Sequence, residues 1–73
     1  MRMISLSEAE IGKEYVIAEI KVEEKKILHH LGELGFYAGK SVIVTQKSFT
    51  ICCRINSSIY GISKEIAEKI LVK

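Results

Sequence analysis

The sequence predicts a mainly β protein: a small curled barrel of about five strands, with one inserted helix and short helical turns near its ends. Short runs rich in β-branched and aromatic residues recur along the chain, separated by glycine or polar turns, which is typical of strands. One stretch, 23–34, instead has apolar residues at helical spacing. A chain of 73 residues has room for one small sheet, and curling that sheet buries apolar side chains and removes open edges.

The composition is that of a single folded domain over 1–73. Hydrophobic residues make up 48% of the chain and charged residues 27%, which excludes a disordered tail. The net charge is only +2, and acidic and basic side chains are interleaved, as in 8–14 and 23–26. Duplex-binding proteins more often gather Lys and Arg on one face, so we expect no nucleic acid partner.

The sequence also predicts where the protein resides. No apolar run approaches the roughly 18 residues needed to cross a bilayer, and the start of the chain lacks the apolar core of a signal peptide. Cys52 and Cys53 are adjacent, whereas small secreted proteins use separated cysteines as disulfide staples. We therefore expect a cytoplasmic protein that does not insert into the membrane directly.

The first elements are a helical turn and a strand. Ser5 and Glu8 have the spacing of a capping box, which predicts a single helical turn through 9–10. A turn at 11–14 and a strand over 15–20 follow. Alternation gives this strand two faces, and we expect the more uniformly apolar one to point inward. The inward set is then Val16, Ala18 and Ile20, and the outward set Tyr15, Ile17 and Glu19.

The helix is predicted over Glu23–Leu34. Glu23 and Glu24 would face the positive end of its dipole in the first turn. Gly32 weakens the helix by about 1 kcal/mol relative to alanine, which favours a close packing contact there. Gly35 ends the helix, and Gly39 marks the turn into the next strand. The buried face consists of Ile27, Leu28, Leu31 and Leu34.

A meander of three strands is predicted over 42–47, 50–55 and 58–63, joined by short polar turns at 47–48 and 56–57. Ser63 can cap a last helical turn over 64–69, and 70–72 forms a final strand. The expected inward residues of the meander are Val42, Val44, Ile51, Cys53, Ile55, Tyr60 and Ile62.

A series of residues in fixed order resembles the signature of the ferrous iron transport protein A (FeoA) family: Leu31-x-Glu33-Leu34-Gly35-Phe36-x-x-Gly39-x-x-Val42-x-Val44. The opening Leu6-Ser7-Glu8, the Gly12 turn and the closing Ala67-x-x-Ile70-x-Val72 extend the resemblance over nearly the whole chain. The chain departs from the family pattern in having no proline and no glycine near position 57.

The resemblance implies an SH3-like barrel and an accessory role in ferrous iron uptake. The implied partner is the membrane-embedded, GTP-driven transporter FeoB, so the protein would be cytoplasmic and recruited to the inner face of the membrane. Its sequence has no GxSxG, GxxxxGK[ST] or HExxH motif, and we expect neither enzyme activity nor a cofactor.

Residues at the end of the helix are our candidates for partner binding, because aromatic side chains in a short loop often anchor an interface. Phe36 has a second interpretation as a plug for the end of the barrel, which we favour for that residue. Tyr37, Phe49 and Ile59 are expected to be exposed. The candidate set is Leu34, Gly35, Phe36, Tyr37 and Gly39.

The potential metal ligands have unfavourable geometry. His29 and His30 are neighbours on a helix and point about 100° apart, while Cys52 and Cys53 are neighbours on a strand and point to opposite faces. Neither pair can chelate as a pair, so we predict no metal site and place Cys53 in the core. A composite of His30, Glu33 and one cysteine stays open as a weak direct sensor of Fe(II).

A second alternative comes from a different class of protein. Similar SH3-like domains occur at the C-termini of iron-dependent repressors of the DtxR type, where they are regulatory appendages. This chain begins at its own methionine and has no helix-turn-helix or basic recognition helix, which favours a stand-alone protein.

Overall fold

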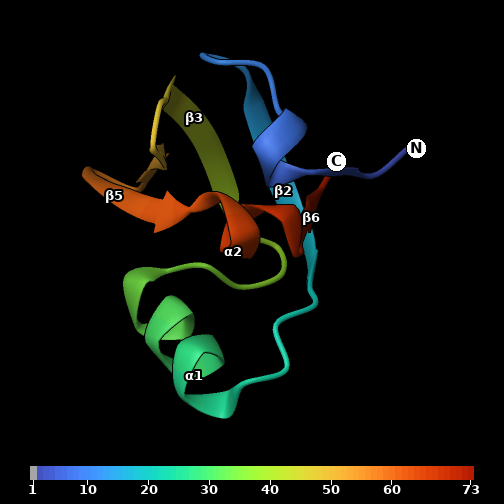
Figure 1. Ribbon diagram of the computed structural model, residues 1–73. Coiled ribbons are helices and arrows are strands. Elements are labelled where there is room, and N and C mark those ends of the chain that lie inside the picture. Colours follow the sequence, from blue (N-terminus) through green and yellow to red (C-terminus); the bar gives the residue numbers. More distant parts are fainter. Residues whose placement is uncertain (1) are drawn as a thin grey trace.

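The computed structural model describes residues 2–73 as one antiparallel sheet with two helices and a 3₁₀ turn (Figure 1). The strand order is β1-β6-β2-β3-β4-β5. The strands are β1 (Ile4–Ser5), β2 (Glu14–Ile20), β3 (Ser41–Lys47), β4 (Thr50–Ile55), β5 (Ser58–Ser63) and β6 (Ile70–Val72). The helical elements are η1 (Leu6–Glu8), α1 (Lys25–Leu34) and α2 (Lys64–Glu68).

The mainly β fold class with one inserted helix is confirmed. The sheet gains a sixth strand because 4–5 pairs with β6 beyond the predicted set. The sheet curls but is not closed: in the part of the chain that is described, β1 and β5 are its two edges and no pairing joins them.

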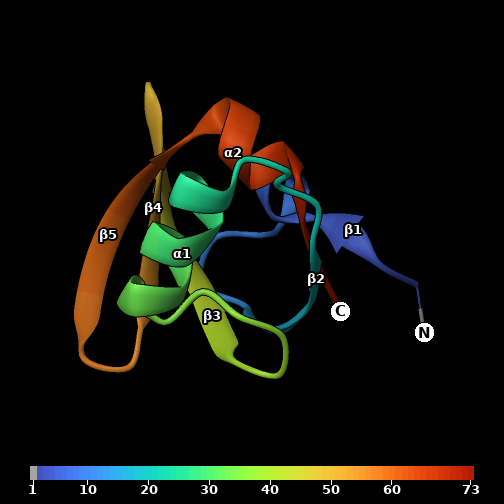
Figure 2. The ribbon, with the colours of Figure 1, turned by 90° about the horizontal axis from the view of Figure 1, so that it is seen from below.

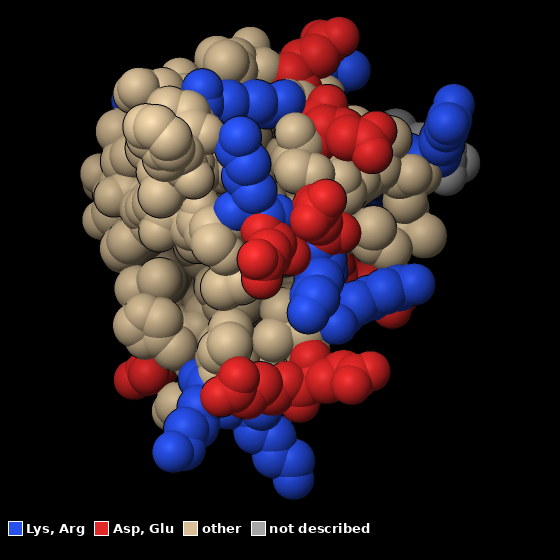
Figure 3. All heavy atoms as spheres, in the orientation of Figure 1, with Lys and Arg blue, Asp and Glu red and all other residues tan. Residues whose placement is uncertain are grey.

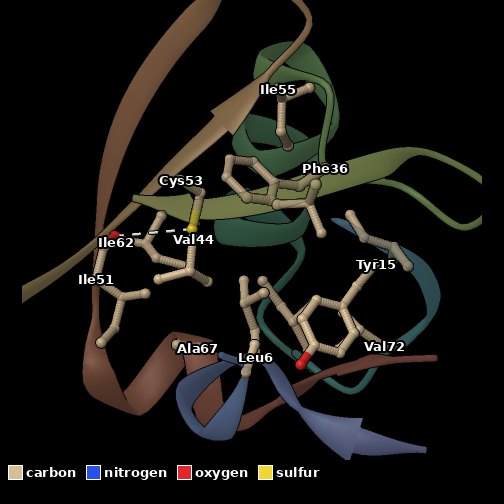
Figure 4. Close-up of a cluster of buried hydrophobic side chains, with 14 of the residues drawn as sticks. Leu6, Tyr15, Phe36, Val44, Ile51, Cys53, Ile55, Ile62, Ala67 and Val72 are labelled. Carbon is tan, nitrogen blue, oxygen red and sulfur yellow. Dashed lines mark hydrogen bonds between the residues drawn. The ribbon is translucent and has the colours of Figure 1, made fainter. Parts of the chain in front are cut away.

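One hydrophobic core fills the concave side of the sheet, and most of the predicted inward residues are in it (Figure 4). Tyr60, on the edge strand β5, is only half-buried. The fully buried large side chains are Phe36, Leu6, Ile17, Ile51, Ile55, Ile70, Val42, Val44, Val72 and Cys53.

The predicted faces of β2 are wrong. Tyr15 and Ile17 are buried, at 7% and 1% exposed, whereas Val16, Ala18 and Ile20 are only half-buried. Tyr15 can point inward because its hydroxyl reaches the rim of the core and accepts a hydrogen bond from the backbone N–H of Glu10 at 3.0 Å. A register shift between Ile17 and Glu19 in the pairing with β6 also interrupts the alternation.

Helix α1 is shorter than predicted. It begins at Lys25, so Glu23 and Glu24 precede it and its first turn contains no acidic residue. Leu28 is 40% exposed and does not belong to the buried face. A Cβ built on Gly32 would meet nothing within 4 Å among the described residues, so the expected close contact at this glycine is also wrong. Leu31 is the buried residue of the helix, and Ile27 and Leu34 pack against the core partly buried.

The predicted capping box at Ser5 is wrong as well. The helical turn ends at Glu8, and Ser5 makes no capping hydrogen bond. Its hydroxyl instead lies 2.7 Å from that of Ser7. By contrast, Ser63 does cap α2: its Oγ accepts from the N–H of Ile66 at 3.2 Å. Asn56 adopts the positive φ, 58°, expected in the turn between β4 and β5.

Candidate docking surface at the end of helix α1

Two glycines fix the loop that leaves helix α1. Gly35 adopts φ 107°, and a Cβ there would lie 2.9 Å from Cγ2 of Ile55, so both the backbone angle and the space require glycine. The N–H of Phe36 donates to the carbonyl of Leu31 at 2.9 Å and closes the helix end. The N–H of Gly39 donates to the carbonyl of Ile17 at 2.8 Å, which ties the far end of the loop to β2.

Phe36 is buried beneath this loop. It is 1% exposed, and its ring meets that of Tyr60 edge-on with centroids 6.3 Å apart. The side chain therefore fills the end of the core, as the plug interpretation expects (Figure 4). Phe36 can contribute to docking only by holding the loop in place.

Tyr37 is the aromatic side chain that the loop presents to solvent. It is 50% exposed, and Nζ of Lys40 lies 5.8 Å from the centroid of its ring. The N–H of Lys40 donates to the carbonyl of Tyr37 at 3.2 Å, so a tight turn holds the two residues together. Leu34 is half-buried at the last turn of the helix. We call Leu34, Tyr37 and Lys40 the loop surface.

A hollow of about 350 Å³ lies between α1 and the end of β5, and the sequence did not predict it. Leu34 belongs both to this α1–β5 hollow and to the loop surface. The hollow includes Ile66 of α2, an element that is far from α1 in the sequence. The hollow is lined by Lys26, Ile27, His30, Leu31, Leu34, Gly61, Ile62, Ser63 and Ile66.

The potential metal ligands are dispersed. Nε2 of His29 lies 3.7 Å from Oε1 of Glu33, but these side chains are 80% and 64% exposed. His30 faces the α1–β5 hollow from the helix, whereas both cysteines are on β4. Among residues 2–73, no three His, Cys, Asp or Glu side chains are grouped so that they could hold a metal ion.

Cys53 lies in the core, as predicted. Its Sγ is 3.8 Å from the carbonyl oxygen of Ile51 (Figure 4). Burial, with a smaller contribution from the neighbouring Cys52, raises its pKa to about 12. Cys53 is therefore a protonated and unreactive thiol at neutral pH, while Cys52 is half-buried on the other face of β4.

None of the helices described in residues 2–73 combines the length and the apolar character that a membrane span requires.

Comparison with known proteins identifies relatives by sequence family and by structure. The family model for the FeoA domain matches residues 4–73. No curated protein matches the sequence. A crystal structure of an iron uptake regulatory protein (FeoA) superposes with a TM-score of 0.87 at 19% identity, covering 100% of this chain and 97% of that one.

Two further structures show how widely the fold is used. A FeoA-like protein from Clostridium acetobutylicum has a TM-score of 0.83 at 24% identity, covering 100% of this chain and 87% of the other. IdeR from T. acidophilum has a TM-score of 0.89 at 22% identity, covering 99% of this chain but only 34% of the other. The fold is thus the SH3-like one that FeoA proteins share with the C-terminal domain of DtxR-type repressors.

Proposed function

The chain belongs to the FeoA family, and we propose that it is a cytoplasmic accessory protein of ferrous iron uptake that acts by contact with a FeoB-type membrane transporter. The observation that carries the proposal is the family match over 4–73, which leaves almost no part of the chain for another function. We propose no enzyme activity and no resident metal. Fe(II) is then the cargo of the transporter, and this protein is recruited to the transporter at the inner face of the membrane.

The loop surface is our proposed contact with the transporter. Exposed aromatic side chains on a rigid support lose little conformational entropy when they bind, and they are frequent interface anchors. Tyr37 meets this description because hydrogen bonds at Phe36 and Gly39 fix both ends of its loop. Gly35, Gly39 and the buried Phe36 act as supports, and Leu34 and Tyr37 make the contact.

The test is a binding measurement with the purified cytoplasmic portion of the transporter. Tyr37→Ala should weaken binding about tenfold or more, as expected for an aromatic anchor. Leu34→Asp should do the same, provided that its circular dichroism spectrum and melting temperature show an intact fold. Phe49→Ala is the matched control, because Phe49 is 97% exposed in the turn between β3 and β4, at the opposite end of β3 from the loop. Unchanged binding by Tyr37→Ala would contradict the placement.

A second candidate function rests on the similarity to IdeR. This chain corresponds in fold to about a third of that protein, so it could serve as a regulatory domain for a DtxR-type repressor. The same binding assay separates the two functions when it is repeated with a DtxR-type repressor that lacks its own SH3-like domain. Binding to the repressor but not to the transporter would favour this second function.

A third candidate, direct sensing of Fe(II), has the least support. His29 and Glu33 are exposed, and the histidines and cysteines do not converge within residues 2–73. An anaerobic NMR titration would show it through the signals of His29, His30, Cys52 and Cys53. We expect these signals to remain unmoved.

A further inference from the structure

Strand β5 is an unprotected edge of the sheet. It runs for six residues, Ser58–Ser63, and contains no charged residue and no proline. Its pairing with β4 has no register shift. Natural proteins usually protect an edge with charges, proline, a bulge or a covering element, and β5 has none of the first three. The other edge, β1, is only two residues long.

The free side of β5 faces outward. Figure 2 shows β5 at the margin of the molecule, with α1 lying beside it on the inner side of the sheet. The flank that carries β5 in Figure 1 is largely uncharged in Figure 3, while Lys, Arg, Asp and Glu gather over other parts of the same face. Ile59, on the outer face of the strand, is 55% exposed. This flank therefore offers backbone and apolar groups rather than charge.

The register shows which backbone groups are free. Oγ1 of Thr45 on β3 donates to the carbonyl of Cys52 at 3.3 Å, so the backbone of Cys52 faces β3. Cys52 is opposite Gly61 in the pairing of β4 with β5, so Gly61 does not bond to β4. Hydrogen-bonded and non-hydrogen-bonded pairs alternate along an antiparallel ladder. Ile59, two residues before Gly61, therefore also does not bond to β4. In residues 2–73 no other hydrogen bond engages the backbone of either residue.

Gly61 gives an independent indication. Glycine inside a strand costs stability and often marks a place where another backbone approaches closely. Nothing in the described part of the chain requires a glycine here, because a Cβ at Gly61 would make only ordinary contacts of 3.5 and 3.8 Å with Thr50. The glycine has a use if a further backbone lies along the outer side of β5.

The α1–β5 hollow lies directly beside this edge. Gly61, Ile62 and Ser63 form its wall on β5, while Ile27, Leu31 and Leu34 form its wall on the helix. A strand added to β5 would point every second side chain toward the helix, so those side chains would enter the hollow. Among residues 2–73, the only charged or titratable side chains that line the hollow are Lys26 and His30, and none of the lining residues is acidic.

From these observations we infer that the edge of β5 and the α1–β5 hollow form one site for an extended peptide segment of a partner protein. The segment adds to β5 as a seventh strand, with alternating apolar side chains in the hollow and an acidic residue beside Lys26 and His30. Strand addition supplies main-chain hydrogen bonds, and the pocket selects the side chains. This goes beyond the proposed function because it concerns a second surface and does not depend on which protein carries the segment.

The direction of the added strand follows from the placement of charge. Lys26 lies in the first turn of α1 and His30 one turn further along, and both line the hollow together with Ser63, at the end of β5. The N-terminus of an antiparallel segment would lie at this end of β5. An antiparallel segment should therefore carry its acidic residues first, and a parallel one should carry them last.

Synthetic peptides test the inference directly. The probe is acetyl-Asp-Glu-Val-Thr-Val-Thr-Val-Thr-amide, titrated into the ¹⁵N-labelled protein. We expect saturable shifts at the amides of Ile59 and Gly61 and at residues lining the hollow. The reversed sequence should bind several-fold more weakly. If the reversed peptide instead binds more tightly, its acidic residues still lie beside Lys26 and His30, but the added strand is parallel to β5.

Methylation of the peptide backbone distinguishes strand addition from simple hydrophobic binding. The valines should face the hollow, and their N–H groups should point away from β5, so N-methylation of valines should leave the affinity largely unchanged. N-methylation of the threonines removes hydrogen bonds to Ile59 and Gly61 and should weaken binding about tenfold. Equal effects of both modifications, or unmoved Ile59 and Gly61 signals at saturation, would overturn the inference.

Protein variants complete the test. Gly61→Pro removes an N–H that does not bond to β4, so it should preserve the fold and weaken the peptide about tenfold. Lys26→Glu should weaken the acidic peptide several-fold, while Lys25→Glu, on the neighbouring exposed residue that does not line the hollow, should not. A peptide that does not bind to the parent protein, or that binds equally to all the variants, would also overturn the inference. Neither result would bear on the transporter assay with Tyr37→Ala.

Discussion

Cys52 and Cys53 show how much one position along a strand matters at the scale of single residues. They are covalent neighbours, yet Cys53 is fully buried and Cys52 is half-buried on the opposite face. The sequence predicted this contrast from alternation alone, because Cys53 shares a face with Ile51 and Ile55. The difference in environment makes two chemically identical thiols behave differently.

Alkylation should separate the two thiols. At neutral pH iodoacetamide should modify Cys52 in the folded protein, while Cys53 should react only as fast as the protein unfolds. Mass spectrometry of the peptides reports each site. Modification of Cys53 at the same rate as Cys52 under native conditions would contradict the assigned burial.

The raised pKa of Cys53 also predicts a loss of stability at alkaline pH. The pKa in the folded state is about 12, against 9.0 for the ordinary thiol, so the folded state holds the proton more tightly than the unfolded state. The free energy of unfolding should therefore be unaffected by this group below pH 9 and fall as the pH rises toward 12, by at most about 4 kcal/mol. Denaturant titrations of the parent and of Cys53→Ala isolate the effect from other titrating groups. If the free energy of unfolding fell equally with pH in the two proteins, the raised pKa of Cys53 would be contradicted.

At the scale of the element, helix α1 has one glycine within it, Gly32, and one at its C-cap, Gly35, with opposite roles. Gly35→Ala should destabilise the protein by about 1–3 kcal/mol, because alanine is strained at φ 107° and its Cβ would meet Ile55 at 2.9 Å. Gly32→Ala is the matched change in the open part of the same helix and should stabilise it by up to about 1 kcal/mol. Thermal melts of both variants check the prediction, and equal effects would contradict it.

The two serines before helical turns form another pair. Ser63→Ala removes the bond to the N–H of Ile66 and should cost about 1 kcal/mol. Ser5→Ala should cost less, because Ser5 caps nothing in the described structure. Chemical denaturation measures both values. If the loss at Ser5 were larger, the cap on α2 would not be the stabilising contact that its geometry indicates.

The elements that the sequence predicted correctly are those with local causes. The limits of β4 and β5 follow from β-branched runs and from the turn at Asn56, and the end of α1 follows from Gly35. The faces of β2 could not be predicted in this way. They depend on the bulge opposite β6 and on the hydrogen bond at the hydroxyl of Tyr15, and both bring together residues that are distant in the chain or outside the strand.

At the scale of the whole molecule, the candidate site was predicted in part. The two glycines at its ends identified the loop from Gly35 to Gly39, and Tyr37 is exposed there as expected. The α1–β5 hollow could not be predicted, because it exists only where α1, β5 and α2 meet. Tertiary packing of three elements creates a concave surface that no single segment encodes.

The open sheet carries two candidate surfaces, which share Leu34. The loop surface displays an aromatic side chain on a rigid turn, and the edge of β5 displays backbone groups beside an apolar hollow. We propose that both surfaces are protein contacts. In residues 2–73 no three His, Cys, Asp or Glu side chains are grouped so that they could hold a metal ion.

The most direct test of this account is calorimetric titration of the purified protein, first with the cytoplasmic portion of a FeoB-type transporter and then, under anaerobic conditions, with Fe(II) alone. The account predicts saturable binding to the transporter portion that Tyr37→Ala weakens about tenfold or more and Phe49→Ala leaves unchanged. It predicts no comparable binding of Fe(II). Tight, stoichiometric binding of Fe(II) together with no binding to the transporter would contradict it.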